Sequence, residues 1–497
     1  MNNANLWTPH LLIPSSILLL FCVVSIGLIR RLLLSTLARI PGPTPAAATW
    51  FWLWYWDLRE HSAAVIQELH KQYGPIVRIG PNEVSINDVE VHNNVLYKHR
   101  TTFMKFPGYY DTFANGTHNV FTTSNHVEHG QLRRLMSNGF SRSQILSYEP
   151  RIWEKVKLLS SIIAEQYHDG EVLNLVFAFR CLALDVITTF AYGDAFDALH
   201  SPGFKEPLLE SFDAFASANT FFMLSPKLQA IVAPKIALLP TKTFKAFAKM
   251  QLVSLPLAKK EEFDSLSFTP TLSGEIETGR RSGIEVTDAR LISDGIGSIF
   301  AGTDTTGISL SVGAWAIFSR EEVRQRLHTE LREIWQDPNS HPSLTELEAL
   351  PYLRACVLES LRLATPIQTR FPRVVPAGGW SYKKYYLPAG TIVSSSSFLM
   401  HNDELVFPNP RVFDPNRWLT QDTELLALRK KQWAPFSLGV RQCIGLNIAM
   451  AEIFIGLAEM IRSFAAIEVV TKEFNPIGMF TVTIPGGLNV KVRKIAE

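Results

Sequence analysis

The sequence predicts a mainly α-helical protein with a few small β-sheets, preceded by an N-terminal transmembrane helix. The chain has 497 residues, 46% hydrophobic and 11% aromatic, which is ample for a sizeable core. Apolar residues follow a mostly helical pattern from Ile152 to Phe318. Short β-like runs precede this region, at Ile76–Ile79 and Glu83–Ile86. After it, Tyr385–Val393 and Thr481–Ile484 are expected to form strands around turn residues. Because no repeat or low-complexity linker follows residue 60, we expect residues 41–497 to form one domain.

Residues 1–40 are expected to form a membrane anchor with a basic flank. Leu11–Ile29 contains no charged residue and is long enough to span a bilayer. Arg30, Arg31 and Arg39 follow it, whereas no Lys or Arg precedes it. The positive-inside rule therefore places the C-terminal bulk in the cytosol. A cleaved signal peptide is the alternative, but its basic residues would precede the apolar run, so a retained single-pass anchor is favoured.

The segment after the anchor is rich in proline and then in tryptophan. Ile40–Pro43 is expected to be a stiff, non-helical hinge that ends the anchor. Trp50, Trp52, Trp54 and Trp56 then alternate along the chain. Their rings either seat the domain at the membrane–water interface or pack in its own core, and the sequence leaves both alternatives open.

Charge and cysteine content exclude several classes of protein. The formal net charge of +2 argues against a nucleic-acid-binding protein. The four cysteines, with no Cys-x-x-Cys pair, exclude a disulfide scaffold, the usual zinc spacings and a c-type cytochrome. They are Cys22, Cys181, Cys356 and Cys443.

One of these cysteines lies in a distinctive run, from Phe436 to Gly445. Gly439 permits a tight turn, and Arg441 offers a permanently charged fork to a carboxylate. Cys443 precedes a helical pattern, so a helix N-terminus is expected to lower its pKa and favour thiolate. A thiolate ligand pushes electron density onto haem iron and favours O–O cleavage. The alternative is a single structural cysteine near a turn.

This run resembles the haem-binding signature of the cytochrome P450 superfamily, Phe-x-x-Gly-x-Arg-x-Cys-x-Gly, at every fixed position. The resemblance implies the P450 fold, in which haem b lies between a long distal helix and a proximal loop and helix. It makes Cys443 the axial iron ligand, with Phe436, Gly439, Arg441 and Gly445 around the cofactor. Other stretches of the sequence are similar to those of fungal microsomal members that act in secondary metabolism.

Leu291–Phe318 is expected to be the long helix on the opposite side of the haem. Ala301–Thr306 interrupts its apolar pattern with small residues, an acid and hydroxyls, which predicts a local loosening that frees a carbonyl and holds water. Proton delivery to bound oxygen suits a hydroxyl beside a carboxylate. The stretch matches the superfamily's distal motif, which implies Thr305 as the dioxygen-side hydroxyl and Asp304 as the proton-relay acid. A Ser/Thr-rich kink in a core helix is the alternative.

The resemblance also implies a structural triad. Glu359 and Arg362 are three residues apart on a predicted helix, so they share a face. Together they match Glu-x-x-Arg, and Arg417 supplies the second arginine. Asn416 stands where the family more often has Glu. We expect the triad to lock the loop that carries Cys443.

Further haem contacts are expected from three residues. Arg133 and His129 are one helical turn apart, where family members often have Arg and Trp on a haem propionate. The histidine keeps an N–H donor, although a lone histidine is more often a surface residue. Arg373 is a further candidate propionate partner.

The expected substrate pocket is largely apolar. By family correspondence it is lined from Phe103–Thr117, Ile299–Thr306, Pro366–Gln368 and Met479–Thr481. A terpenoid, steroid or polyketide fits best. Phe212–Leu257, broken by prolines, is expected to form either core helices or a lid over the substrate channel. The sequon Asn115–Thr117 is expected to be unmodified in the cytosol.

The resemblance implies a monooxygenase of the endoplasmic reticulum membrane, supplied with NADPH electrons by a reductase and with cytochrome b5 as a further candidate partner. Five residues are candidates for a basic docking face: Arg133, Arg134, Arg429, Lys430 and Lys431. The main alternative keeps the fold but isomerises or dehydrates a hydroperoxide without a reductase. A membrane-tethered haem sensor or store is the alternative from another class, and a structural protein without haem is a third.

Overall fold

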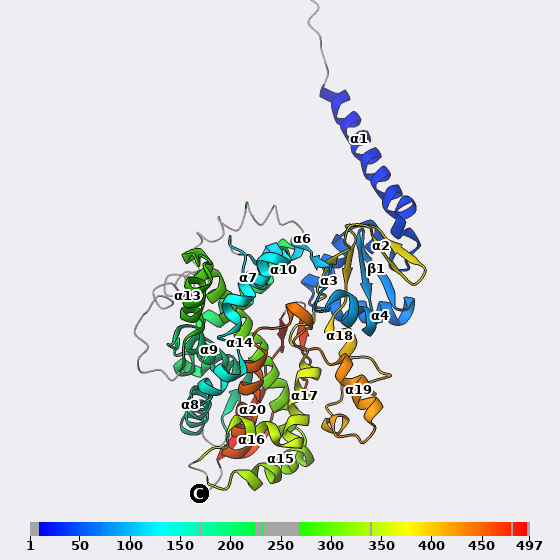
Figure 1. The fold of residues 1–497 in the computed structure, drawn as a ribbon. Helices are drawn as coiled ribbons and strands as arrows, with labels where there is room; N and C mark the ends of the chain where they lie inside the picture. The colour runs from blue at the N-terminus through cyan, green and yellow to red at the C-terminus, as the bar shows by residue number, and fades with distance from the viewer. Residues whose placement is uncertain are drawn as a thin grey trace, which may run out of the picture.

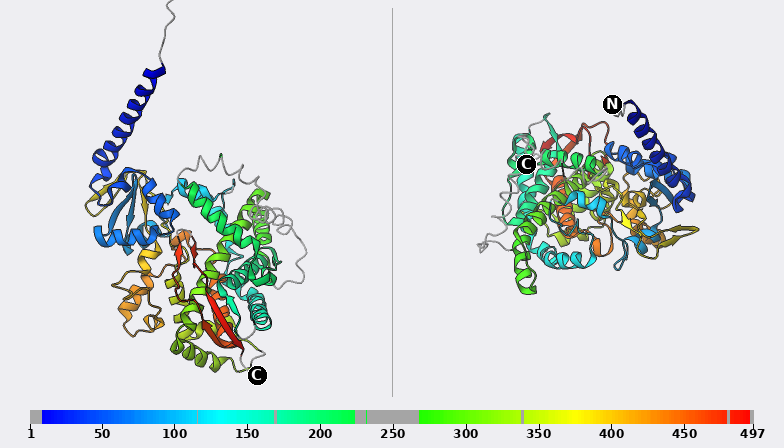
Figure 2. Two further views of the ribbon diagram at one scale, coloured as in Figure 1. Left: turned by 180° about the vertical axis from the view of Figure 1, so that it is seen from behind. Right: turned by 90° about the horizontal axis from the view of Figure 1, so that it is seen from above.

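The structure is a computed structural model that describes residues 9–114, 116–167, 170–223, 231, 268–337, 340–478 and 481–494. It consists of a part rich in β-strands, a larger helical part, and one helix, α1 (Pro9–Ile29), that projects away from both (Figures 1 and 2). α1 continues into a π-helix, η1 (Arg30–Leu34). The 3-10 helix η2 (Thr36–Arg39) then leads into the body of the protein.

The projecting helix has the length and composition of a membrane span. Its window Ile17–Leu34 has a mean hydropathy of 2.4, and none of it is buried. Another helix, α9 (Leu175–Tyr192), is also apolar enough, but 94% of it is buried, so it belongs to the core. The helical turns of the anchor end at Leu34, ahead of the predicted hinge at Ile40–Pro43 rather than at it.

The β-rich part is built on a five-stranded sheet with the order β1-β2-β8-β5-β3. Its strands are β1 (Ile76–Gly80), β2 (Glu83–Ile86), β3 (Met104–Lys105), β5 (Arg373–Val374) and β8 (Ile392–Ser394). β1 and β2 are antiparallel, and β2 pairs with β8 in parallel. The two strands predicted near the N-terminus are therefore confirmed.

The segment Tyr385–Val393 forms strands around turn residues, as predicted. It is divided into β7 (Tyr385–Leu387), which pairs with β6 (Trp380–Tyr382), and β8 in the five-stranded sheet. The break has a local cause, because Gly390 has a φ of 83° and follows Pro388, which cannot donate to a ladder. The chain therefore turns from one sheet into the other.

Of the alternating tryptophans, Trp52, Trp54 and Trp56 lie on the helix α3 (Phe51–Leu58), and Trp50 is its N-cap residue. Trp50 and Trp52 pack against a cluster of buried residues from the sheet and neighbouring helices. Trp54 contacts Phe221, its Nε1 donating to the carbonyl oxygen at 3.1 Å. These three rings thus pack against the domain.

The helical part contains most of the chain. Its helices, with the shorter ones of the β-rich part, are α2 (Thr44–Ala48), α4 (Ser62–Tyr73), α5 (Val89–Val91), α6 (Pro107–Tyr110), α7 (His126–Ser137), α8 (Arg142–Gln166), α10 (Pro207–Phe222), α13 (Thr271–Ser282), α14 (Asp288–Phe318), α15 (Glu321–Ile334), α16 (Leu344–Ala349), α17 (Pro351–Ala364), α18 (Ser397–His401), α19 (Thr423–Gln432) and α20 (Leu446–Ser463). Two small sheets complete the fold, β4 (Val172–Asn174), β12 (Asn489–Lys494) and β9 (Phe464–Val469) in one and β10 (Ile477–Gly478) with β11 (Val482–Thr483) in the other.

The long helix α14 is the centre of this part. It packs against α9, α17 and α20, and Figure 1 shows it running between them. Gly302 allows a close approach, because a Cβ there would lie 2.6 Å from the side chain of Ile187 on α9. Helix–helix contacts of this kind bury the apolar faces that make up the main core.

The predicted loosening of this helix at Ala301–Thr306 is wrong. α14 continues from Asp288 to Phe318 without a break. The hydroxyl of Thr305 donates to the carbonyl oxygen of Ala301 at 2.7 Å, and Thr303 does the same to Ile299. Hydroxyl bonds to carbonyls four residues earlier slightly weaken and often bend a helix, but they do not interrupt α14 here.

Candidate active site

The loop before α20 carries Cys443 and is held by its own backbone. The amide of Cys443 donates to the carbonyl oxygen of Phe436 at 2.8 Å, which closes the loop. Gly439 has a φ of 67°, and a Cβ there would lie 2.3 Å from the carbonyl oxygen of Tyr97. Only glycine fits both conditions, so the close approach of this loop to residues 97–98 depends on Gly439.

Cys443 opens on a cavity of about 330 Å³. Phe436, Arg441 and Gly445 line the cavity beside it, and Thr305 of α14 lines it too. The side chain of Cys443 is accessible, but this accessibility is to the interior cavity. Segments that are more than a hundred residues apart in the sequence thus meet around one space.

The pKa of Cys443 is shifted in the direction opposite to the sequence prediction. Burial raises the pKa of this thiol, and the Gly445 amide and the charge of Arg133 only partly oppose the rise. The helix N-terminus is therefore outweighed by desolvation. A metal cation at the sulfur reverses this balance, because a coordinating thiol is deprotonated outright.

Cations gather along one part of the cavity wall. Arg441 is held by the carbonyl oxygens of Thr123 and Ser124, at 2.8 and 3.3 Å. Arg373 is 3% exposed and donates to the hydroxyl oxygen of Tyr110 at 2.9 Å. These neutral partners fix the guanidinium groups in place but leave their charges uncompensated.

The repulsion between these charges appears in their pKa values. Burial and the neighbouring Arg373 lower the pKa of Arg441 to about 10. Burial, with the charges of Arg441 and Lys105, lowers the pKa of His129 to about 3, so its imidazole is neutral. The Nε of Arg441 is buried without a hydrogen-bond partner among the described residues. Buried charges in proteins are normally paired, so this wall fits an anionic group.

The wall therefore suits the two propionates of a haem. Arg441 and Arg373 supply charge, Lys105 supplies a further N–H donor, and neutral His129 can supply a ring N–H. Arg133, predicted beside a propionate, lines the same cavity, and its Nη1 donates to the carbonyl oxygen of Gln442 at 2.5 Å. It thus holds the residue before Cys443.

Lys105 was not identified from the sequence. It lies on the edge strand β3, is 5% exposed, and donates to the carbonyl oxygen of Phe121 at 2.5 Å. Its ammonium also stands over the rings of Tyr110 and Phe121. Burial and the charges of Arg373 and Arg441 lower its pKa well below the usual range. A single lysine between aromatic residues carries no motif, so only the fold reveals it.

Glu452 on α20 also lines the cavity and was not identified. It is 2% exposed, its Oε1 has no hydrogen-bond partner among the described residues, and burial raises its pKa well above the usual range. The only sequence signal was an acid within an apolar helical pattern.

Thr305 and Asp304 face different surroundings. Thr305 lines the cavity, whereas Asp304 is not among the residues described around it. Asp304 pairs with Arg180, whose Nε lies 2.8 Å from Oδ1. Burial raises the pKa of Asp304, and the charge of Arg180 opposes this rise. The carboxylate is thus held beside α9 and does not stand next to the hydroxyl in the cavity.

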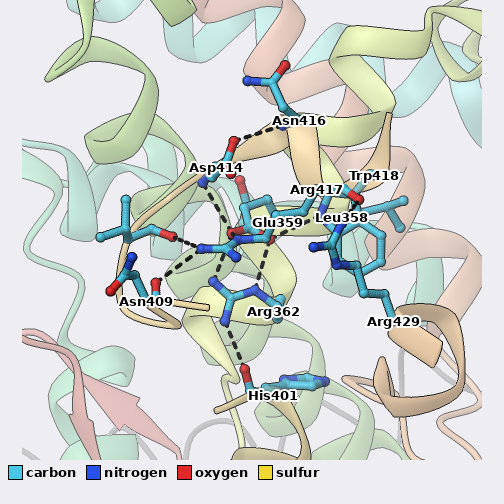
Figure 3. A network of polar contacts seen from close by, with 12 residues as sticks. Leu358, Glu359, Arg362, His401, Asn409, Asp414, Asn416, Arg417, Trp418 and Arg429 are labelled. Carbon is cyan, nitrogen blue, oxygen red and sulfur yellow. Dashed lines mark hydrogen bonds and ion pairs between the residues drawn. The ribbon is translucent and has the colours of Figure 1, made fainter. Parts of the chain in front are cut away.

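The Glu359, Arg362 and Arg417 side chains form one buried network (Figure 3). Arg362 makes two bonds to Glu359, at 2.8 and 2.9 Å, and Arg417 lies 3.2 Å from the same carboxylate. The Nε1 of Trp418 and the amide of Asp414 complete the set of donors to Glu359. All lone-pair positions of a buried carboxylate are thereby used.

The predicted basic docking face is only partly at the surface. Arg429 is 7% exposed and donates to the carbonyl oxygens of Arg417 and Val406, at 2.6 and 3.2 Å. It therefore lies in the interior and bonds to the backbone of the network shown in Figure 3, rather than facing a partner protein. Lys431 is paired with Glu90. Arg134 and Lys430 are exposed.

The distal end of the cavity is aromatic and apolar, as predicted. The lining residues from the predicted segments are Lys105, Tyr110, Phe113, Phe300, Ala301, Gly302, Thr305, Thr306, Pro366, Ile367 and Thr481. Phe212 and Phe215 of α10 also line it. Met479, Asn115 and most of the predicted lid, Phe212–Leu257, lie outside the described residues.

A sulfur on one wall of a cation-rimmed cavity, with a hydroxyl-bearing helix across it, defines a haem-thiolate protein. Comparison with known sequences agrees, since the Cytochrome P450 family pattern matches residues 40–492. The chain is 32% identical over 408 residues to the cytochrome P450 monooxygenase macH of Penicillium terrestre, covering 80% of this chain and 79% of the relative. It is 33% identical over 480 residues to sdnE, another such monooxygenase, of Sordaria araneosa, covering 91% of both chains.

A third relative is the tryptophan 6-hydroxylase fscE of Fusarium equiseti, 33% identical over 483 residues, which cover 94% of this chain and 92% of the relative. The chain therefore belongs to the cytochrome P450 family, and it is a haem-dependent monooxygenase.

Proposed function

We propose that this monooxygenase inserts one oxygen atom from O2 into a lipophilic small molecule in fungal secondary metabolite biosynthesis. The observation that carries the proposal is that Cys443 and Thr305 face one cavity whose distal lining is apolar and aromatic. Bound haem supplies the oxygen chemistry. The apolar wall binds and orients the substrate and excludes water from the reacting atoms.

Each site residue has a proposed task. Cys443 ligates the iron, and Arg133 holds the preceding carbonyl so that the sulfur keeps its direction. Arg441, Arg373, Lys105 and His129 hold the propionates. Thr305 positions a proton donor in the cavity, and Asp304 feeds protons toward it. Because Asp304 is paired with Arg180, that delivery requires the pair to open or water to bridge it.

The substrate class proposed is a terpenoid, steroid or polyketide. The support is the chemistry of the lining, in which Phe113, Phe212, Phe215 and Phe300 provide aromatic contact area. The relative from Fusarium equiseti is named for the hydroxylation of tryptophan. An aromatic amino acid therefore belongs among the candidates tested.

Electrons are proposed to come from NADPH through a flavoprotein reductase, with cytochrome b5 as a second donor. The exposed Arg134 and Lys430 offer positive charge for an acidic partner. The catalytic domain is proposed to be residues 41–497. Residues 1–40 tether it to the endoplasmic reticulum, with the domain in the cytosol, since arginines follow the span.

The test is a substrate-binding and turnover screen of the full-length protein in membranes. Terpenoids, steroids, polyketides and aromatic amino acids are added, and the shift of the haem absorbance is recorded. Positive compounds are then incubated with NADPH and reductase, with each omitted in turn. We expect oxygenated product only when both are present. Product from a hydroperoxide without either would support the alternative isomerase or dehydratase.

The ligand assignment has its own test. Replacing Cys443 with His is expected to abolish the long-wavelength absorbance of the reduced carbon-monoxide complex. The matched control is Cys181→Ser, since Cys181 is buried on α9 away from the cavity lining. An unchanged spectrum in the Cys443 variant would refute the assignment.

A further inference from the structure

His401 joins the Glu359–Arg362 network to the loop that carries Cys443. It is the last residue of α18 and is fully buried, at 0% exposure. Its carbonyl oxygen accepts from Nη1 of Arg362 at 2.9 Å, as Figure 3 shows. Its ring nitrogens contact two other elements, the end of α17 and the start of the cysteine loop.

The hydrogen-bond directions fix the tautomer of this ring. The hydroxyl of Thr365 donates its one proton to the carbonyl oxygen of Arg362 at 2.7 Å. Thr365 Oγ1 must therefore accept from His401 Nδ1, which lies 2.8 Å away. With its proton on Nδ1, the neutral ring presents a lone pair at Nε2, and the amide of Ala434 donates to that atom at 3.0 Å.

The ring stays in this neutral state. Burial, with the charges of Arg362 and His92, lowers the pKa of His401 to about 3. A protonated imidazole has no lone pair and could not accept from the amide of Ala434. The neutral ring therefore keeps its bond to the loop.

Both backbone polar groups of Ala434, its N–H and its carbonyl oxygen, are hydrogen-bonded. While His401 accepts from its N–H, Ser397 donates to its carbonyl oxygen at 2.6 Å. The preceding residue, Trp433, donates from Nε1 to the carbonyl oxygen of Leu358, beside Glu359, at 3.0 Å. The start of the loop is thus bound to α17 and α18, and the loop closes through the bond from Cys443 to Phe436.

The backbone is strained at Thr365, the residue that orients His401. Thr365 ends α17 with φ 35° and ψ 67°, a left-handed conformation that is rare for a β-branched residue. Glycine or asparagine would relieve the strain. Neither could provide the hydroxyl that both bonds Arg362 and orients His401, so the strain is retained where the hydroxyl is needed.

We propose that His401 is a positioning residue of the haem-thiolate site. It holds the Ala434 amide in place and so couples the position of the loop bearing Cys443 to the Glu359–Arg362 pair. Its partner Thr365 sets the tautomer that makes this possible. The proposal rests on the assignment of Cys443 as the iron ligand.

The test uses two amide replacements of similar polarity. In His401→Gln the side-chain oxygen reaches the position of Nε2 and can accept from Ala434. In His401→Asn the amide reaches only the position of Nδ1, so the Ala434 N–H loses its acceptor. Each holoenzyme is reduced, bound to carbon monoxide and warmed while its absorbance spectrum is recorded. The readout is the rate at which the long-wavelength band of the thiolate-ligated haem converts to the shorter-wavelength band that marks loss of the thiolate ligand.

We expect conversion on the order of fivefold faster in His401→Asn than in His401→Gln, the effect of one buried hydrogen bond. Equal rates in the two variants would overturn the proposal. Thr365→Val and Thr365→Ser form a second pair that keeps the histidine. Only the valine variant should convert faster, and equal rates there would also overturn it. Failure of the wild type to show the long-wavelength band would instead reject the assignment of Cys443.

Discussion

Nε of Arg180 lies 2.8 Å from Oδ1 of Asp304, and this buried pair fixes the acid of the distal helix on the side away from the cavity. Arg180 also reaches Asp213 of α10 at 2.8 Å, so one guanidinium joins α9, α14 and α10. Burial lowers the pKa of Arg180, but the two carboxylates outweigh it and the pKa is raised overall. Asp304 can therefore act on the cavity only through movement of Arg180 or through water.

This relationship predicts a large effect of Asp304→Asn and a small one of Asp213→Asn. If Asp304 is the acid that supplies protons, replacing its carboxyl group with the amide of asparagine should slow product formation by roughly a hundredfold, the lower end of the range for general acid catalysis. The measurement is product per minute at saturating NADPH and reductase. Loss of Asp213, which is half exposed, leaves the inner pair in place. Equal slowing in both variants would show that the ion-pair geometry matters and the acid itself does not.

The second prediction concerns the replacement of Thr305. Thr305→Ala should keep NADPH oxidation going while product falls and hydrogen peroxide accumulates, because the hydroxyl proposed to position the proton donor is lost. Thr305→Ser is the matched control, since it retains the hydroxyl that bonds Ala301. NADPH, product and peroxide are measured together. Tight coupling in the alanine variant would show that proton delivery runs elsewhere.

The Glu359 network predicts a loss of stability. Glu359→Gln leaves Arg362 and Arg417 buried with no carboxylate, which should cost about 3–5 kcal/mol in the free energy of unfolding. Haem should be lost at lower denaturant concentration. Glu90→Gln is the control, because Glu90 pairs with Lys431 at the surface and screened pairs contribute little. A similar small shift in both variants would contradict a structural role for the network.

The sequence predicted the parts of the site that are contiguous. Cys443 and Gly439 lie within one run, where spacing alone specifies a turn, and Gly439 is confirmed by its φ. Lys105 and His401 were not identified, because their partners are distant in sequence and only the tertiary fold brings them together.

Errors in local structure arose where two physical tendencies compete. Hydroxyls such as Thr305 weaken helices in isolation, yet here they bond to carbonyls within a helix that tertiary packing already stabilises. The pKa of Cys443 shows the same competition, with burial stronger than the helix terminus.

The last prediction concerns stability against pH. Glu275 of α13 is 1% exposed, and both of its carboxylate oxygens lack hydrogen-bond partners among the described residues. It lies beside Asp294 of α14, whose Oδ2 is 3.5 Å from Nε of Arg290. Burial and the charge of Asp294 raise the pKa of Glu275, and Arg290 only partly opposes this.

In the unfolded chain Glu275 loses its proton near its ordinary pKa, whereas the folded protein keeps that proton to higher pH. Folding therefore binds a proton in this window, and stability must fall as pH rises, by up to about 1.4 kcal/mol per pH unit from this group. Glu275→Gln keeps the shape without the titration, so its free energy of unfolding should decline less between pH 5 and about pH 8. Glu277→Gln, at an exposed pair with Arg281 on the same helix, should follow the wild type. Parallel curves for all three proteins would mean that Glu275 is ionised in the folded state.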